Sequence, residues 1–363
     1  MQKDSKIYVA GHNGLVGSAI VRNLKQKGYT NIIGRSHSEL DLTDAVAVDK
    51  FFASEKPEYV FLAAAKVGGI MANSLYRSDF IMINMQIQCN VISAAHKYGV
   101  KKFMFLGSSC IYPKMAPQPM VEECLLTGEL EYTNEPYALA KIAGIRMCES
   151  MNLQFGTNYI AVMPTNLYGP NDNYDLEKSH VLPAMIRKMH LGKALEEGRM
   201  DAIRRDLNAR PVEGVDGNAS EESILAILAK YGLTRKNGKV VLNLWGTGTP
   251  LREFLHSDDM ADACVFLMEN VDFKDIVGNR EMKEIRNTHI NIGSGTELTI
   301  SDIANKVKRI IGFAGDIRWD ASKPDGTPRK LMNVSRLARL GWTYKIHLDE
   351  GIKGVYENYV SRL

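Results

Sequence analysis

A glycine-rich turn between a strand-like segment and a helix-like segment constrains the fold of this chain more than any other feature. Lys6 to Ala10 is short and largely apolar, which is typical of a buried strand. Gly11, Gly14 and Gly17 follow it, and the helical pattern after them ends at Gly28. Such a turn lets a helix N-terminus, with its free N–H groups, approach a pyrophosphate closely. The GxxGxxG spacing differs from GxGxxG, so a purely structural turn is the alternative.

Strands and helices alternate along the first half of the chain. The predicted strands after the first are Ile32–Ile33, Tyr59–Leu62, Phe103–Leu106 and Tyr159–Met163. Two further predicted helices are Asp79–Tyr98 and Asn134–Met151. This alternation predicts an α/β fold with a Rossmann-type, doubly wound parallel sheet.

The regular alternation of predicted strands and helices ends after Pro164. The chain of 363 residues is also longer than the roughly 150 of a typical domain. We predict a Rossmann domain at about 1–165 with a returning segment at about 255–291. A smaller C-terminal α/β substrate-binding lobe is predicted at about 166–254 and 292–363. It includes a charged insert at about 192–239, with a helix capped by Ser220 and ended by Gly232. We expect a surface excursion there, and a lid or an oligomer contact is the alternative.

Composition excludes several classes of function. The 45 Lys and Arg against 42 Asp and Glu, a net charge of +3, give no case for nucleic acid as a main partner. No apolar run approaches the roughly 20 residues of a membrane helix, and no signal peptide is recognisable. The cysteines lack CxxC spacing, so we predict no metal site, no disulfide framework and a reducing cytoplasm. They are Cys89, Cys110, Cys124, Cys148 and Cys264.

Arg35 and Ser36 follow the second predicted strand, where a site that prefers NAD would usually carry an acid. An arginine there can pair with a 2′-phosphate, and the serine can donate a hydrogen bond. The pattern therefore favours NADP over NAD, with a solvated surface charge as the alternative reading of Arg35.

Tyr137 and Lys141 lie four residues apart on a predicted helix, and therefore on one of its faces. A nearby ammonium is expected to lower the pKa of a phenol, which can then exchange a proton with a substrate oxygen as hydride moves. Ser108 and Ser109 follow the fourth predicted strand and could bond the same oxygen. The YxxxK pattern alone often arises by chance, but its combination with the glycine turn seldom does.

Together these motifs resemble the extended short-chain dehydrogenase/reductase superfamily. Longer stretches resemble its NADPH-dependent branch that inverts C3 and C5 and reduces C4 of GDP-4-keto-6-deoxy-D-mannose. The resemblance covers nearly the whole chain outside the insert. Its stretches are Ala63–Ile70, Gly107–Pro113, Asn134–Ala138, Met163–Pro170, Arg252–His256 and Lys323–Lys330.

The resemblance implies a proton-transfer pair, Cys110 and His180. A ketone at C4 acidifies the hydrogens on C3 and C5, and inversion needs a base on one face and an acid on the other. We assign the base to Cys110 and the acid to His180, whose reference pKa values of about 8.5 and 6.5 bracket neutrality. Tyr137 and Ser108 would stabilise the enolate oxygen. Taken alone, Cys110 would be interpreted as a small buried hydrophobe.

The resemblance also implies binding residues. The implied catalytic set is Tyr137, Lys141, Ser108, Cys110 and His180. The implied NADP set is Gly11, His12, Asn13, Gly14, Leu15, Val16, Gly17, Arg35, Ser36, Asp41, Leu42, Ala64, Leu106, Gly107, Ser108, Ser109, Tyr137, Lys141, Pro164, Thr165, Asn166, Leu167 and His180. The implied substrate set is Lys188, Trp245, Arg252 and Asp325. Cations suit phosphates, and tryptophan offers a stacking face. Asn13 stands where some relatives have arginine, which leaves more of the NADP preference to Arg35.

Other functions stay open at this point. Another nucleotide-sugar 4-epimerase or a dehydratase of the same superfamily is the first alternative, although a dehydratase would be expected to carry an Asp-Glu pair after Ser108. A redox-sensing binding protein without catalysis is the second, although such proteins tend to lose the Tyr/Lys pair. The long predicted helices and the resemblance favour a homodimer.

Overall fold

The computed structural model describes residues 1–236, 238–278, 284–323 and 325–363. Two compact units divide the chain. Unit 1 comprises Met1–Leu167, Glu253–Thr296 and Lys330–Lys345, and unit 2 comprises Tyr168–Arg252, Glu297–Arg329 and Ile346–Leu363. The segment Lys330–Lys345 therefore lies in unit 1, whereas the predicted division placed it in the smaller lobe. Among the described residues, no helix combines the length and the apolar character needed to cross a membrane.

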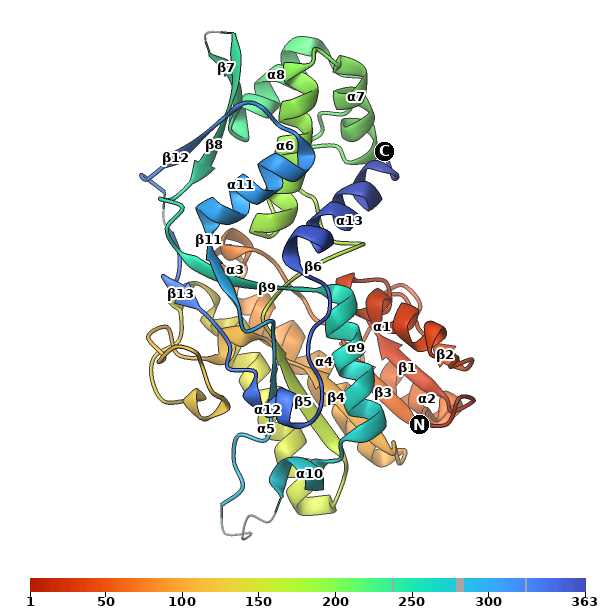
Figure 1. Cartoon of the computed structure of the whole chain (residues 1–363). Helices are drawn as coiled ribbons and strands as arrows, with labels where there is room; N and C mark the ends of the chain where they lie inside the picture. The colour runs from red at the N-terminus through yellow and green to blue at the C-terminus, as the bar shows by residue number, and fades with distance from the viewer. Residues whose placement is uncertain (237, 279–283, 324) are drawn as a thin grey trace. The chain divides into compact units, whose positions relative to one another are not determined.

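Unit 1 contains a six-stranded sheet in the order β10-β5-β4-β3-β1-β2, in which every neighbouring pair is parallel (Figure 1). Its strands are β1 (Ile7–Ala10), β2 (Ile32–Ile33), β3 (Tyr59–Leu62), β4 (Lys102–Leu106), β5 (Tyr159–Pro164) and β10 (Ile290–Ile292). Most strand residues are buried on both faces, as expected of apolar runs that do not alternate with polar residues. The predicted parallel α/β fold is confirmed.

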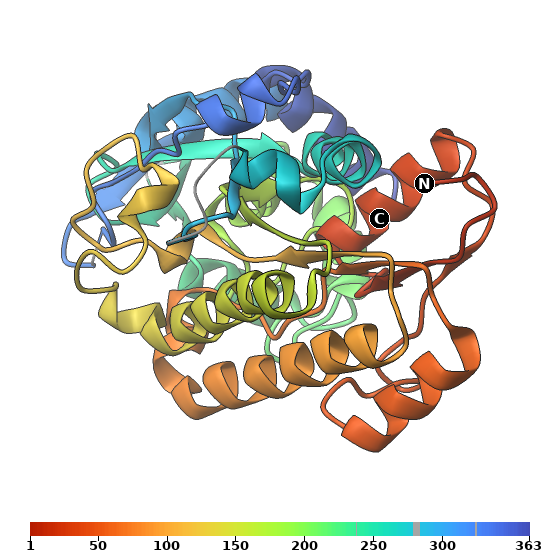
Figure 2. The same ribbon diagram turned by 90° about the horizontal axis from the view of Figure 1, so that it is seen from below.

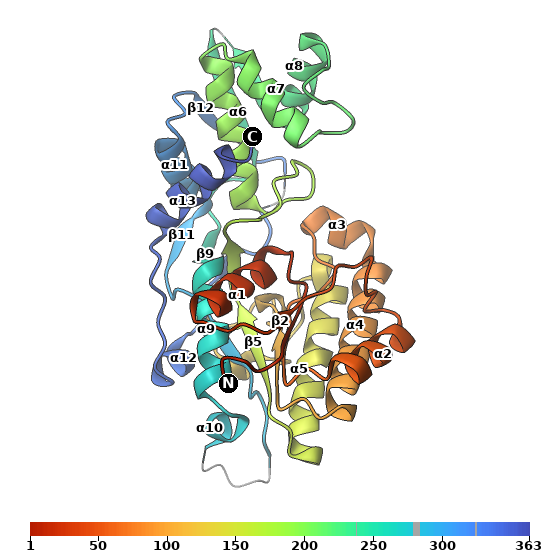
Figure 3. The same cartoon turned by 90° about the vertical axis from the view of Figure 1, so that its right-hand side faces the viewer.

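Helices cover both faces of this sheet. Helices α1 (Leu15–Gln26) and α9 (Ser257–Asn270) pack together on one face. Helices α2 (Ala45–Glu55), α4 (Arg77–Lys97) and α5 (Glu135–Phe155) lie on the other, as Figures 2 and 3 show. Strand residues alternate between the two cores, since Val9 packs towards α1 and α9 while Tyr8 packs towards α2. The sheet therefore separates α5, which carries Tyr137, from α1, which follows the glycine turn.

Shorter elements complete unit 1. They are α3 (Ile70–Leu75), α10 (Phe273–Val277), α12 (Ser335–Arg339) and the 3-10 turns η1 (Ser109–Ile111), η2 (Glu122–Cys124) and η3 (Tyr132–Asn134). The chain passes between the units within β6 (Asn166–Tyr168), β9 (Leu251–His256) and β13 (Arg329–Lys330).

Unit 2 combines helices with a three-stranded sheet in the order β12-β8-β7. Its elements are α6 (Val181–Glu196), α7 (Met200–Ala209), α8 (Glu221–Lys230), β7 (Leu233–Lys236), β8 (Lys239–Trp245), β11 (Glu297–Thr299), α11 (Ile300–Ile311), β12 (Asp316–Asp320) and α13 (Leu348–Val360). Helix α6 packs against α7, α11 and β8, and α11 packs against α13. A buried ion pair between Arg187 and Asp206 joins α6 to α7.

The charged insert is part of this packing. Helix α8 begins after Ser220, whose hydroxyl accepts a hydrogen bond from Ser223 N, and the chain turns at Gly232 with a φ of +95°. Leu207 of α7 and Ile224 of α8 are fully buried. The insert is therefore more than the surface excursion that its composition predicts. Asn237, within the insert, lies outside the described residues.

Candidate active site

The glycine turn after β1 has the geometry that a pyrophosphate requires. Gly11 has a φ of +82°, and a Cβ atom there would lie 2.9 Å from the Ala64 backbone. A Cβ atom on Gly17 would lie 2.1 Å from the Gly11 carbonyl oxygen. Helix α1 begins after Gly14 with no side-chain cap and no acid in its first turn, so its N-terminal amides are available to an anion.

His12 adds a polar group to this turn. Its Nδ1 is buried and has no hydrogen-bond partner among the described residues. Its ring lies against Gly34, where a Cβ atom would come within 2.4 Å of the imidazole. An unpartnered buried nitrogen beside a glycine turn fits a site for a dinucleotide.

Arg35 and Ser36 are close to this turn but are engaged with carboxylates. Arg35 Nη2 donates to Glu55 Oε1 at 2.7 Å, and its guanidinium lies over the Phe51 ring. Both the amide and the hydroxyl of Ser36 donate to Glu39 Oε2 at 2.7 Å. A 2′-phosphate would therefore have to exchange with these carboxylates.

The other residues predicted to bind the cofactor lie in segments that follow the parallel strands or at the start of α1. Asn13, Leu15 and Val16 belong to the turn and to α1. Asp41 and Leu42 follow β2, Ala64 follows β3, Leu106 to Ser109 end or follow β4, and Pro164 to Leu167 end or follow β5. Parallel strands end at one edge of a sheet, which is where such folds bind nucleotides. Asn166 is fixed there, because its Nδ2 donates to the Glu253 carbonyl at 2.8 Å.

Tyr137 and Lys141 occupy the first turns of α5. The Lys141 ammonium donates to the Leu106 carbonyl at 2.8 Å and lies 5.7 Å from the centre of the Tyr137 ring. Gly144, one turn later, allows α5 to come this close to β4, because a Cβ atom there would meet the Phe105 ring at 2.2 Å. Burial lowers the pKa of Lys141 to about 8.

The pKa of Tyr137 differs from the sequence-based expectation. Burial raises the pKa of the phenol well above 10, and the neighbouring Cys110 adds to this rise, while a hydrogen bond to Ser108 opposes it. The net shift is therefore upward, where the sequence predicted a lowered pKa, because burial outweighs any effect of the nearby ammonium. The spacing of two residues cannot show how strongly their surroundings exclude water.

Cys110 lies in the 3-10 turn η1, next to the same two residues. Its side chain is 7% exposed, and its amide donates to the Ser108 hydroxyl at 3.3 Å. Burial raises the pKa of the thiol, whereas the charges of Lys330 and Lys141 and the Ser108 hydrogen bond lower it. Unit 1 thus gathers a phenol, a hydroxyl, a thiol and an ammonium. Lys330 ends the stretch Lys323–Lys330, and no role is predicted for it from the sequence.

A buried network holds the segment that follows Cys110. Tyr112 Oη donates to Asn291 Oδ1 at 2.5 Å and lies 3.0 Å from His289 Nε2. The Asn291 amide N–H donates in turn to Glu122 Oε1 at 3.1 Å. Sequence reasoning missed these partners, because each of the three contacts joins residues more than 160 positions apart along the chain.

His180 and the four residues predicted to bind substrate belong to unit 2. His180 is exposed and directly precedes α6. Cys110 lies in unit 1, so the pairing of this thiol with His180 stays a prediction. Lys188 is half-buried on α6, and burial lowers its pKa to about 8. Its ammonium lies 6.0 Å from the centre of the Tyr231 ring.

The other three predicted substrate residues, Trp245, Arg252 and Asp325, lie in or near the turn after β8. Trp245 is 60% exposed, and the Lys323 ammonium lies 5.6 Å from its ring. The Asp325 carboxylate accepts from Thr247 N at 2.7 Å and from Thr247 Oγ1 at 2.9 Å, which closes this turn. Burial lowers the pKa of Arg252, and the charge of Asp325 opposes this shift. Pro324, within the stretch Lys323–Lys330, lies outside the described residues.

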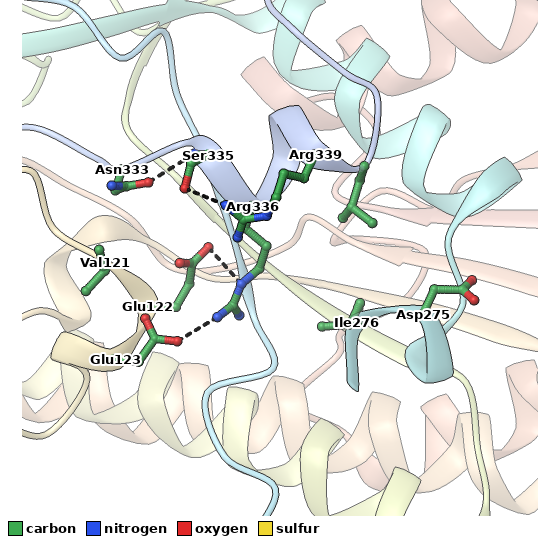
Figure 4. A pocket seen from close by; sticks show the side chains of 10 residues that line it. Val121, Glu122, Glu123, Asp275, Ile276, Asn333, Ser335, Arg336 and Arg339 are labelled. Atoms are coloured by element: carbon green, nitrogen blue, oxygen red, sulfur yellow. Dashed lines mark hydrogen bonds and ion pairs between the residues drawn. The ribbon is translucent and has the colours of Figure 1, made fainter. Parts of the chain in front are cut away.

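The described residues contain no cluster of three or more His, Cys, Asp or Glu that could hold a metal ion. All five cysteines are free thiols. A pocket of about 410 Å³ in unit 1 contains none of the predicted site residues (Figure 4). Its main cation, Arg336, is paired with Glu122 and Glu123, which leaves it little capacity for a ligand. The lining residues are Val121, Glu122, Glu123, Asp275, Ile276, Asn333, Ser335, Arg336, Arg339 and Leu340.

Comparison with known proteins identifies the family. The model of the NAD dependent epimerase/dehydratase family matches residues 7–210 and 207–293. The chain belongs to this family. This confirms the superfamily that the motifs predicted.

Individual members of the epimerase/dehydratase family are similar over their full length. GDP-L-fucose synthase 1 of Arabidopsis thaliana is 50% identical, with 99% of this chain and 95% of that protein covered. GDP-L-fucose synthase of Escherichia coli is 46% identical, with 98% and 97% covered. Among solved structures, a GDP-D-glycero-L-gluco-heptose synthase from Campylobacter jejuni, in the presence of NADPH, is 44% identical with a TM-score of 0.90, and 99% of each chain is covered.

Proposed function

We propose that the protein converts GDP-4-keto-6-deoxy-D-mannose into GDP-L-fucose with NADPH, by inverting C3 and C5 and reducing C4. Relatives named GDP-L-fucose synthase, about half identical over the full length, support this function. The observation that carries it is the cluster of Ser108, Cys110 and Tyr137 beside Lys141. A dehydratase would carry an acid pair after Ser108, and a 4-epimerase has no use for the thiol.

Unit 1 is proposed to bind NADP and unit 2 the sugar nucleotide. The glycine turn, the free N-terminus of α1 and His12 Nδ1 would hold the pyrophosphate region. Arg35 would release Glu55 and pair with the 2′-phosphate. A relative solved in the presence of NADPH supports this cofactor. When bound, the cofactor supplies the hydride for C4.

Tyr137 is proposed to give the proton to O4 in the reduction. Its raised pKa keeps the phenol protonated at neutral pH, which is the form a proton donor needs. Ser108 bonds this phenol and is placed to bond O4 as well. Lys141, held by the Leu106 carbonyl, supplies the positive charge that stabilises the phenolate left behind.

Cys110 is proposed to start both epimerisations. The thiolate removes the proton from C3 or C5, the electron pair moves into an enolate at O4, and His180 returns a proton from the opposite face. The positive charges of Lys330 and Lys141 favour the thiolate against the effect of burial. Tyr137 and Ser108 would stabilise the enolate oxygen, so one set of donors serves both reactions.

The homodimer and the cytoplasmic location are part of this proposal. Exposed apolar side chains on α3 and α4, among them Met71, Leu75 and Met82, support an interface. Free thiols at all five cysteines are compatible with a reducing compartment. Sedimentation of the purified protein tests the dimer.

The test of function measures NADPH oxidation with GDP-4-keto-6-deoxy-D-mannose, with a GDP-4-keto-heptose and with a UDP-4-keto sugar. We expect the first to react fastest, with deuterium from D₂O entering C3 and C5 of the product. Oxidation without deuterium entry would make the protein a C4 reductase only. No oxidation with any of the sugars would favour a binding protein.

A further inference from the structure

Tyr231, in the insert, is the aromatic residue that unit 2 places next to Lys188. It directly follows α8 and is half-buried, and the Lys188 ammonium lies over its ring, 6.0 Å from the centre. An ammonium over an aromatic face is attracted by the ring, the more so when water is excluded. The insert therefore contacts one of the predicted substrate residues.

The pairing of β7 with β8 brings the residue after Tyr231 onto the strand that ends in Trp245, a second predicted substrate residue. Asn243 N donates to the Gly232 carbonyl at 2.8 Å, directly after Tyr231 in the chain. Gly232 makes this approach possible, because a Cβ atom there would lie 2.4 Å from the Asn243 carbonyl oxygen. Trp245 ends β8 two residues further on. Tyr231 thus contacts Lys188 of α6, and the residue after it is bonded to the strand that ends in Trp245.

The ring is held in place from its hydroxyl end. Tyr231 Oη donates to Glu213 Oε1 at 2.6 Å, and the Lys230 ammonium binds the same carboxylate. Burial raises the pKa of the phenol, and the charges of Glu213, Glu177 and Asp175 add to the rise. The hydroxyl is thereby committed to Glu213, and the ring face is what remains for Lys188.

Lys188 differs from the other cations of this region. Among the described residues, no hydrogen bond or ion pair engages its ammonium. Burial is the cause of its lowered pKa, with no acid to compensate. An ammonium in such surroundings is suited to a ligand that brings its own negative charge.

We infer that the insert forms one wall of the nucleoside diphosphate subsite, in which the Tyr231 ring holds the Lys188 ammonium in position for the diphosphate. Tyr231 is a positioning residue in this view, acting through Lys188. The inference rests on the proposed function for the identity of the nucleotide. It gives the insert a role in substrate affinity.

The test titrates GDP into the full-length protein and its variants by calorimetry. Tyr231→Leu removes the ring and is expected to weaken GDP binding about fivefold to tenfold. Tyr231→Phe keeps the ring and should stay within about twofold of the wild type. Leu225→Ala, on the exposed side of α8, is the matched control and should not change the affinity. Thermal unfolding of each variant checks that the fold is retained.

Two further readouts separate positioning from a general structural effect. In turnover assays, Tyr231→Leu should raise KM for the sugar nucleotide by the same factor and change kcat less. Tyr231→Leu added to Lys188→Met should weaken GDP binding no more than Lys188→Met alone, because the ring acts through the lysine. Wild-type affinity in Tyr231→Leu, or full additivity of the two changes, would overturn the inference.

The outcomes also distinguish the inference from the proposed function. Loss of GDP affinity in Tyr231→Leu, in a protein that binds GDP but does not convert the keto sugar, would support the subsite and overturn the function alone. Normal turnover of the keto sugar, with GDP affinity unchanged in Tyr231→Leu, would overturn the subsite and support the proposed function. A wild-type protein that binds no GDP would overturn both.

Discussion

Two lysines, one in each unit, show how differently the same side chain can be used. Burial lowers the pKa of both Lys141 and Lys188 to about 8. Lys141 donates to the Leu106 carbonyl and lies beside the phenol of Tyr137. Lys188 has the Tyr231 ring beside it and no hydrogen-bond or ion-pair partner among the described residues. The first lysine is positioned by the fold before any ligand arrives, whereas the second is incomplete without one.

The comparison predicts that changes around Lys141 act on kcat, and the largest effect is expected at Tyr137. Tyr137→Phe removes the proton donor but keeps the ring, and kcat for NADPH oxidation should fall by about 10²- to 10⁴-fold. Stopped-flow absorbance of NADPH measures this. Deuterium exchange at C3 and C5 should persist in part, because the thiol is intact. A kcat within tenfold of the wild type would remove the phenol from the reduction.

Cys110→Ser tests the thiol of unit 1 as the base for proton removal. A hydroxyl is a far weaker acid than a thiol, so deuterium entry at C3 and C5 should slow by about 10²-fold or more. Mass spectrometry of the recovered sugar nucleotide in D₂O measures the exchange. NADPH binding should be unchanged, which serves as the control for folding. Exchange at the wild-type rate would exclude the thiol as the base.

Lys188→Met is expected to act on KM instead. Loss of a charged partner for the diphosphate should raise KM by about tenfold to a hundredfold, with a smaller change in kcat. Steady-state kinetics with varied sugar nucleotide separates the two constants. If Lys188→Met lowered kcat and left KM unchanged, the two lysines would not differ in the way proposed.

The smallest effect concerns stability. A charged lysine whose folded pKa of about 8 lies below its unfolded value of 10.5 destabilises the fold below pH 8, and the penalty fades between pH 8 and 10.5. Lys188→Met should therefore stabilise the protein at pH 7 by ~1–3 kcal/mol. Lys141→Met should gain less, because it leaves the Leu106 carbonyl without its donor.

Urea unfolding at pH 7 and pH 9 checks both variants. The advantage of Lys188→Met over the wild type should shrink at the higher pH, as the wild-type ammonium loses its proton. An equal gain for both methionine variants would mean that the carbonyl contact of Lys141 contributes nothing.

The sheet of unit 1 was largely predictable, because β1, β3, β4 and β5 are apolar runs separated by turn residues. Helix α2 was missed, although Asp44 caps it by accepting from Val46 N and Ala47 N. Its weak amphipathic pattern gave little signal. The bounds of helix α6 were not predicted, because apolar residues occur almost all round it.

The site was predictable where one short motif holds both partners, as in the pair of Tyr137 and Lys141. It was not predictable where the partners meet only in three dimensions. Lys330 approaches Cys110 from a segment more than 200 residues away, and Tyr231 reaches Lys188 from an insert whose composition predicted a surface excursion. The sign of the Tyr137 pKa shift also depends on burial, which local spacing does not reveal.

The contact between Gly144 and Phe105 limits which residues position 144 can accept in the course of evolution. Phe105 is 1% exposed in a strand with neighbours on both sides, so its ring has no room to retreat from an added methyl group. A larger residue at 144 would push the helix outwards and carry the phenol and the ammonium away from the sheet together. The positions of both reactive groups therefore depend on the absence of a side chain at Gly144, a residue that takes no part in the chemistry.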